Sequence, residues 1–182
     1  MTRIVHLFDP VERFVAGTVG EPGERTFFLQ ARTGNKLISV SLEKSQVSAL
    51  AERITMMLRD VQKRKPITII TNTSRDDLPL ETPIDEEFRV GVISISYESV
   101  RELIELNLQA VSETGVAAQE FIDVEEGDEL DLLCVFLTLP QAGAFAKRAD
   151  IVVGAGRSSC PFCGLPIDPR GHLCPRANGY RR

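Results

Sequence analysis

The residues best suited to chemistry lie in the C-terminal segment SSCPFCGLPIDPRGHLCPRANGYRR, residues 158–182, which holds three of the four cysteines and one of the two histidines. Four of them, Cys160, Cys163, His172 and Cys174, form the pattern C-x2-C-x8-H-x-C. Structural Zn2+ sites use four sulfur or nitrogen ligands in a tetrahedron, whereas catalytic sites keep one position open for water. The pattern therefore predicts one structural zinc ion per chain.

The residues around the first two cysteines favour a tight turn of the zinc-knuckle kind. Pro161 fixes one backbone angle inside the turn, and Gly164 can adopt the positive φ that closes it. In the second pair, His172 and Cys174 are separated by one residue, so an extended backbone would place both side chains on the same side.

Two other uses of these cysteines stay open. The spacing of Cys160 and Cys163 is also that of a dithiol redox site, but such a site needs a helix beginning at the pair, and the Gly and Pro residues that follow disfavour one. A disulfide would leave one of the three cysteines in this segment unpaired. A chain without a signal peptide is also expected in a reducing compartment.

Length and composition indicate one soluble domain with an appendage. The chain has 182 residues, of which 43% are hydrophobic, enough for one buried core. It contains no apolar run approaching the roughly 20 residues of a membrane span. We expect a cytoplasmic protein with a domain over residues 1–156 and a zinc-binding tail over residues 157–182.

Charge is distributed unevenly between these two regions. The net charge is −5, and from Arg157 onward there are five arginines and one acidic residue, leaving −9 on residues 1–156. A region with this much negative charge repels the phosphate groups of nucleic acids, so general nucleic-acid binding is not expected. The basic tail is suited to an acidic partner, to a phosphate group, or to docking on its own body, and nucleic-acid contact through it is one alternative hypothesis.

Hydrophobic periodicity predicts an α+β fold. Alternation and β-branched residues favour strands, and apolar spacings of three and four favour helices. Strands are expected over residues 3–8, 12–19, 26–32, 36–42, 67–70, 103–111 and 130–138. A further long strand is expected to begin at residue 88 and to end at a turn over 97–101. The helices are expected over residues 45–62 and 140–153.

A weak repeat relates two halves, expected at residues 1–65 and 84–156. The segment FVAGTV at 14–19 resembles FRVGVI at 88–93, and QVSALAER at 46–53 resembles QAGAFAKR at 141–148. The order hairpin, strand, helix would then occur twice. We expect antiparallel sheet with two helices covering one face, followed by the zinc-knuckle module.

No catalytic motif is recognisable, so the catalytic residues are unknown and we expect a binding or adaptor protein rather than an enzyme. The alternative is an enzyme or sensor that binds a phosphorylated or nucleotide ligand in a cleft between the halves. Arg13 and Arg32, with Asp9 or Glu12, are the candidate residues for such a cleft.

The remaining polar residues of interest have simpler interpretations. Arg176, Tyr180 and Arg181 are candidates for contact with a protein partner. His6 has apolar sequence neighbours and is expected to be a core or edge residue, and Cys134 is expected to be a small buried hydrophobic residue. The acidic clusters at 76–87 and 123–131 lack the ligand spacing of a known Ca2+ or Mg2+ loop and are expected to be solvated.

Both ends of the chain resemble a known family. The segments HLFDPVERFVAGTVG at 6–20, FFLQA at 27–31, CPFCG at 160–164 and GHLCPRANGY at 171–180 resemble an uncharacterised bacterial family, mainly actinobacterial, that is classified only as a domain of unknown function. The resemblance covers essentially the whole chain and implies a cytoplasmic protein of about this length. It implies no activity.

Overall fold

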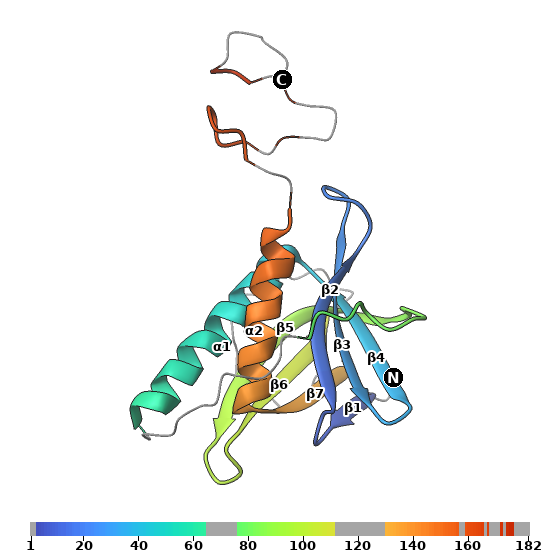
Figure 1. Ribbon diagram of the computed structural model, residues 1–182. Coiled ribbons are helices and arrows are strands. Elements are labelled where there is room, and N and C mark those ends of the chain that lie inside the picture. Colours follow the sequence, from blue (N-terminus) through green and yellow to red (C-terminus); the bar gives the residue numbers. More distant parts are fainter. Residues whose placement is uncertain are drawn as a thin grey trace.

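The computed structural model describes residues 3–64, 76–111, 130–156, 159–165, 167, 172 and 174–176. Figure 1 shows the arrangement of the elements. Within the described residues, the elements in chain order are β1 (Val5–Phe8), β2 (Arg13–Val19), β3 (Thr26–Thr33), β4 (Lys36–Leu42), α1 (Lys44–Arg64), β5 (Glu86–Glu98), β6 (Leu103–Ala110), β7 (Leu132–Thr138) and α2 (Leu139–Gly154).

The strands form one seven-stranded sheet in the order β1-β7-β6-β5-β4-β3-β2. Strands β2, β3 and β4 pair antiparallel with one another, as do β5, β6 and β7. The pairs β4 with β5 and β1 with β7 are parallel. The α+β class is therefore confirmed, but the sheet is mixed rather than antiparallel, because each half begins by pairing with the last strand of the other.

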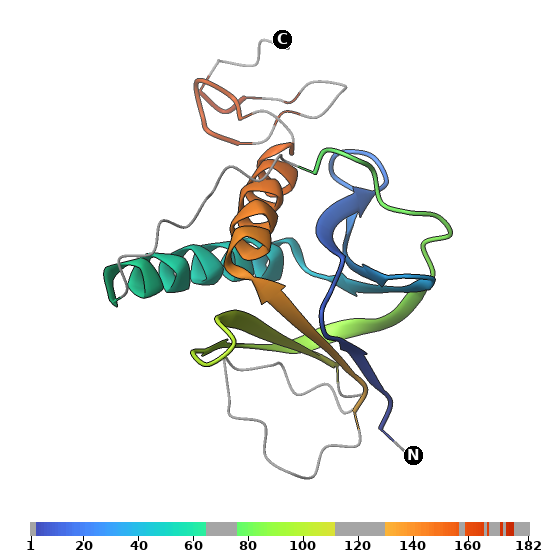
Figure 2. The ribbon, with the colours of Figure 1, turned by 60° about the horizontal axis from the view of Figure 1, so that its bottom comes forward.

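The predicted repeat is present in the order of elements: β2-β3-β4-α1 is followed by β5-β6-β7-α2. The long β5 pairs with β4 up to Arg89 and with β6 from Val90 onward, and the register of the β6 pairing shifts between Val90 and Val92. In the first half two separate strands make the equivalent pairings: β1 pairs with β7, and β2 pairs with β3. The short connection at residues 9–12 thus joins the two ends of the strand order, and the sheet is strongly curled (Figure 2).

Two glutamines at equivalent helix starts tie the halves together. The Gln46 side chain accepts a hydrogen bond from the Glu43 backbone N–H and donates to the carbonyls of Val90 and Gly91 on β5. Gln141 accepts from the Thr138 backbone N–H in a capping box and donates to the Val11 carbonyl just before β2. The start of each helix is therefore hydrogen-bonded to the backbone of the other half, α1 to β5 and α2 to the residue two positions before β2.

The core lies between the sheet and the two helices. The helix residues at spacings of three and four are buried, with Leu50 of α1 and Phe145 of α2 among the most enclosed. The Phe145 ring stacks on Phe14 of β2 with ring centroids 4.8 Å apart. Helix α2 is thereby packed closely against β2, and α1 packs against α2 (Figure 1).

The predicted element boundaries differ from the structure in only a few places. Strand β5 runs through Tyr97 to Glu98, so the turn begins later than expected. The predicted strand at 67–70 and the acidic cluster from 123 to 129 lie outside the described residues. In the part of the chain that the structure describes, neither helix is long and apolar enough to cross a membrane.

Candidate metal centre

The four predicted ligand residues lie together. Their ligand atoms, the sulfurs of Cys160, Cys163 and Cys174 and a ring nitrogen of His172, all lie within 4.8 Å of one another. The Cys160 and Cys174 sulfurs are 3.7 Å apart, and the Cys163 sulfur is 3.3 Å from His172 Nε2. Residues separated by up to 14 positions in the sequence thus converge on a single point that could hold a metal ion.

The first pair is positioned by the tight turn that its sequence predicts. The Gly164 N–H donates to the Cys160 carbonyl at 2.8 Å, and the Cys160 N–H donates to the Leu165 carbonyl at 2.8 Å. Gly164 has φ +75°, a left-handed conformation that glycine adopts without steric cost. The turn therefore projects Cys160 and Cys163 toward the same point.

Backbone groups of the turn favour the thiolate form of the first cysteine. Burial raises the pKa of Cys160, but hydrogen bonds from the N–H groups of Cys163 and Phe162, helped by the neighbouring thiols, lower it to about 7. For Cys163, burial raises the pKa and the sulfurs of Cys174 and Cys160 raise it further, against a hydrogen bond from the Leu165 N–H. Three sulfurs at this distance share anionic charge most stably when a cation lies between them.

The geometry does not match the two alternatives for these cysteines. The distance between the Cys160 and Cys174 sulfurs is far longer than the roughly 2.05 Å of a disulfide, and all four cysteines of the chain are free. In the described residues, Cys163 ends a turn and no helix begins at it. The helix N-terminus that activates a dithiol redox site is therefore missing from the described part of this segment.

The outer surface of the turn carries two apolar side chains. Phe162 is 48% exposed and Leu165 is 52% exposed, whereas Cys160 and Cys174 are each only 5% exposed. Arg176, one of the predicted partner-binding residues, donates from its guanidinium to the Phe162 carbonyl at 3.3 Å. The candidate residues Tyr180 and Arg181 lie outside the described residues.

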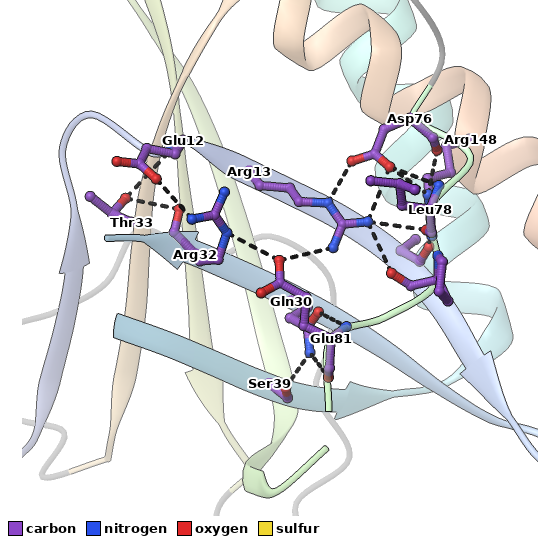
Figure 3. Close-up of polar contacts among 12 residues, drawn as sticks. Glu12, Arg13, Gln30, Arg32, Thr33, Ser39, Asp76, Leu78, Glu81 and Arg148 are labelled. Atoms are coloured by element: carbon purple, nitrogen blue, oxygen red, sulfur yellow. Dashed lines mark hydrogen bonds and ion pairs between the residues drawn. The ribbon is translucent and has the colours of Figure 1, made fainter. Parts of the chain in front are cut away.

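The predicted cleft residue Arg13 lies elsewhere, on β2, where residues 76–83 cross the sheet and Arg148 of α2 also contacts Asp76 (Figure 3). Its guanidinium donates to both Asp76 carboxylate oxygens at 2.6 and 3.0 Å and to the Glu81 carboxylate at 3.2 Å. It also donates to the carbonyls of Leu78 and Pro79. Every nitrogen of Arg13 is thus engaged within the chain.

Other side chains complete the attachment of residues 76–83, which we call the strap. Arg32 pairs with Glu81 at 3.0 Å and with Glu12 at 3.0 Å. The buried Gln30 amide accepts from the Glu81 N–H and donates to the Glu81 carbonyl (Figure 3). The strap therefore satisfies polar groups of the sheet face that it covers.

Electrostatics at the strap follow from these contacts. The hydrogen bond from Arg13 lowers the pKa of Asp76, and the hydrogen bond to Asp76 raises the pKa of Arg13. The structure brings Arg13, Arg32 and Glu12 together next to the strap, where the two arginines bind groups of the chain itself. It separates Asp9 from them, since Asp9 pairs with Arg101 of the other half at 2.9 Å.

The two isolated residues occupy the surroundings expected for them. His6 has 12% of its side chain exposed, and its Nε2 lies 3.3 Å from a Glu87 carboxylate oxygen. Cys134 is buried in β7, and burial, with Glu105 nearby, raises its pKa to about 11. Cys134 is therefore an inert thiol at neutral pH.

Sequence reasoning did not anticipate the strap. The polar residues at 76–85 are typical of a solvated loop, although the strap within them is bound to two strands, β2 and β3. Two signals point to it in retrospect: a glutamine inside the apolar strand β3, and Gly17 inside β2. A Cβ built on Gly17 would lie 2.5 Å from Leu80 Cγ, so only glycine leaves space for the strap there.

The chain thus joins an α+β body with a curled mixed sheet to a C-terminal cluster of three cysteines and one histidine. It belongs to the family described as protein of unknown function DUF3090, whose model matches residues 6–174 and so includes the last cysteine of the cluster. No curated protein matches the chain significantly. No solved structure matches it significantly either.

Proposed function

We propose that the C-terminal segment holds one structural Zn2+ ion and serves as a binding or adaptor module. The observation that carries this is the convergence of Cys160, Cys163, His172 and Cys174. Two thiolates bound to one tetrahedral Zn2+ at about 2.3 Å each lie about 3.8 Å apart, and the Cys160 and Cys174 sulfurs are 3.7 Å apart. Bound zinc would supply no reaction here, because four protein ligands leave no open position.

A structural role for the ion is supported by what this segment lacks. Among its described residues only Cys160 and Cys174 are buried, Ile167 is half-buried, and Phe162 and Leu165 are about half exposed. A segment with so little buried apolar surface cannot offset the conformational entropy of folding on its own. Metal binding would contribute the missing free energy, as it does in other small zinc modules.

A role in binding is supported by the surface of the turn. Phe162 and Leu165 are both about half exposed, and Arg176 lies against the same turn. Residues from Arg157 onward add a net positive charge. An apolar pair next to cations fits a protein partner with an apolar pocket and an acidic rim. Three metal-bound thiolates require reducing conditions, which supports our proposal of a cytoplasmic location.

Elemental analysis of purified variants tests the metal. The wild-type protein is expected to carry one zinc per chain, and Cys163→Ser is expected to lose it. Cys134→Ser is the matched control, since Cys134 is a free thiol buried in β7. Full zinc content in Cys163→Ser, or no metal in the wild type purified without chelators, would contradict the proposed ligand set.

Affinity purification tests the binding role separately. The double variant Phe162→Ser, Leu165→Ser is expected to keep its zinc and to lose a protein that the wild type retains from its own host. The partner is then purified and its Kd measured for both forms. Equal affinity for wild type and double variant would place the binding surface elsewhere while leaving the zinc proposal intact.

A further inference from the structure

A cavity of about 620 Å3 lies between the C-terminal half of α1 and the end of β5. Its apolar wall is formed by Met57 and Val61 on the helix and by Ile95 and Tyr97 on the strand, and Arg53 and Arg64 line it as well. Ligand pockets in proteins have volumes of about 300 to 1,000 Å3 and combine an apolar wall with few polar groups. The cavity has a volume in this range and an apolar wall, and its charged lining residues are Arg53, Asp60 and Arg64.

The sheet beside the cavity shows that the hollow interrupts the core. Ile95 pairs with Leu106 on β6, and Tyr97 pairs with Ile104. The two β6 residues are completely buried, whereas Ile95 and Tyr97 are only partly buried. Protein interiors are otherwise packed as densely as organic crystals. The apolar surface on β5 is therefore left uncovered where α1 passes it.

The repeat within the fold allows the cavity to be compared with the equivalent helix–strand contact in the other half. In the equivalent contact of the other half, α2 lies on β2 and the gap is filled by the stacked rings of Phe145 and Phe14. Helix α1 has 21 residues against 16 in α2, so its last turns have no counterpart. Those turns carry Val61 and Arg64, which line the hollow. The extension of α1 thus builds one wall of the cavity.

Polar groups around the cavity define what could occupy it. The Tyr97 hydroxyl is shielded from solvent and has no hydrogen-bond partner, and such groups are rare in proteins. Asp60, which also lines the cavity, lies 3.7 Å from Lys63, so its charge is offset along the helix. Arg53 and Arg64 also line the cavity, and together they give its lining a net positive charge.

We propose that this cavity binds an amphipathic anion, a small molecule with an apolar body and one carboxylate or similar anionic group. The apolar body packs between Val61 and Tyr97, and the anionic group faces Arg64. Apolar burial supplies most of the affinity and the arginine selects the charge. This proposal is independent of the zinc module.

Decanoate is the probe, with decanol as its uncharged counterpart, and binding is followed by amide chemical shifts of the full-length protein. Decanoate is expected to shift amides of residues 53–64 and 95–99. Arg64→Gln is expected to weaken decanoate binding about ten-fold, the usual contribution of a charge-assisted contact, and to leave decanol binding unchanged. Arg59→Gln, at an exposed α1 position outside the cavity lining, is the matched control and should bind decanoate as the wild type does.

Val61→Phe fills the cavity and is expected to abolish binding of both probes. Arg64→Gln changes an exposed side chain, so it keeps the proposal testable even where Val61→Phe does not fold. The absence of amide shifts with millimolar decanoate overturns the proposal. Equal loss of affinity in Arg64→Gln and Arg59→Gln, or wild-type binding by a folded Val61→Phe, overturns it too.

Discussion

The body and the C-terminal segment are stabilised by different means. In the body, side chains from the sheet and both helices form one continuous apolar core. In the C-terminal segment the buried described residues are cysteines, whereas Phe162 and Leu165 are about half exposed and Ile167 is half-buried. Burial of apolar surface is therefore sufficient to stabilise the body. It is not sufficient to stabilise the C-terminal segment, which depends on the metal that we propose.

The largest effect is expected from a cavity in the body. Phe145→Ala removes a ring that is 2% exposed and stacked on Phe14. Truncation of a buried phenylalanine costs about 3 to 5 kcal/mol. Urea unfolding followed by far-UV circular dichroism should show this loss while zinc content stays at the wild-type value. Loss of zinc from a folded Phe145→Ala protein would break the separation between the two regions.

A smaller effect is expected at the strap. Gly17→Ala forces the new methyl group against Leu80, and overpacking of this kind costs about 1 to 3 kcal/mol. Gly143→Ala on α2 is the matched control, because its Cβ would lie at an ordinary 3.6 Å from Leu58 Cδ1. Helix propensity then favours alanine by about 0.5 to 1 kcal/mol. Thermal melts of the two variants should shift in opposite directions, and a shift of the same sign would contradict the close approach of the strap.

The ion pair under the strap is expected to contribute about 1 kcal/mol, since Asp76 is partly exposed. The pKa of Asp76 is lowered from 3.8 by the Arg13 hydrogen bond. The ion pair therefore contributes fully to stability above the pKa that Asp76 has in the unfolded chain. This contribution is lost as pH falls through the lower pKa that Asp76 has in the folded protein. The stability difference between wild type and Asp76→Asn should be constant from pH 7 to 5 and shrink below about pH 4.

An NMR titration of the Asp76 carboxyl carbon checks the cause of that pH dependence. Its midpoint should lie below 3.8 in the wild type and rise toward the ordinary value in Arg13→Gln. An unchanged midpoint in Arg13→Gln would mean that another group holds the carboxylate in its ionised form.

The smallest effect is expected from chelation on the body. Removal of zinc should abolish hydrogen-exchange protection at Cys160 and Gly164, whose amides are hydrogen-bonded within the turn. It should change the stability of the body by less than about 0.5 kcal/mol, because the two regions have separate sources of stability. Protection of β5, β6 and β7 amides is the measurement. A large loss of protection in these strands would show that the metal also supports the sheet.

Much of this organisation is predictable from the sequence. Alternation and helical spacing place the seven described strands and two helices, and the pattern from Cys160 to Cys174 identifies the cluster, because metal ligation demands fixed residue types at short spacing. The repeat is visible in Gln46 and Gln141, whose side chains make equivalent contacts.

What the sequence does not reveal depends on contacts between distant residues. The parallel pairing of β1 with β7 joins residues 127 positions apart, such as Val5 and Leu132, and no local pattern specifies it. The strap is a second case, since Arg13 and Asp76 are 63 positions apart and no local pattern connects them. The cavity beside Tyr97 is a third, because it arises from the relative lengths of α1 and α2.

The most direct test of the metal-dependent account is native mass spectrometry of the wild-type protein combined with a thiol count before and after chelation. The account predicts the mass of one Zn2+ per chain and three thiols that become reactive when the ion is removed, while the buried Cys134 stays unreactive until the protein unfolds. A metal-free mass, with a Cys160 and Cys163 pair that becomes reactive only after reduction, would contradict it and assign redox chemistry to the segment.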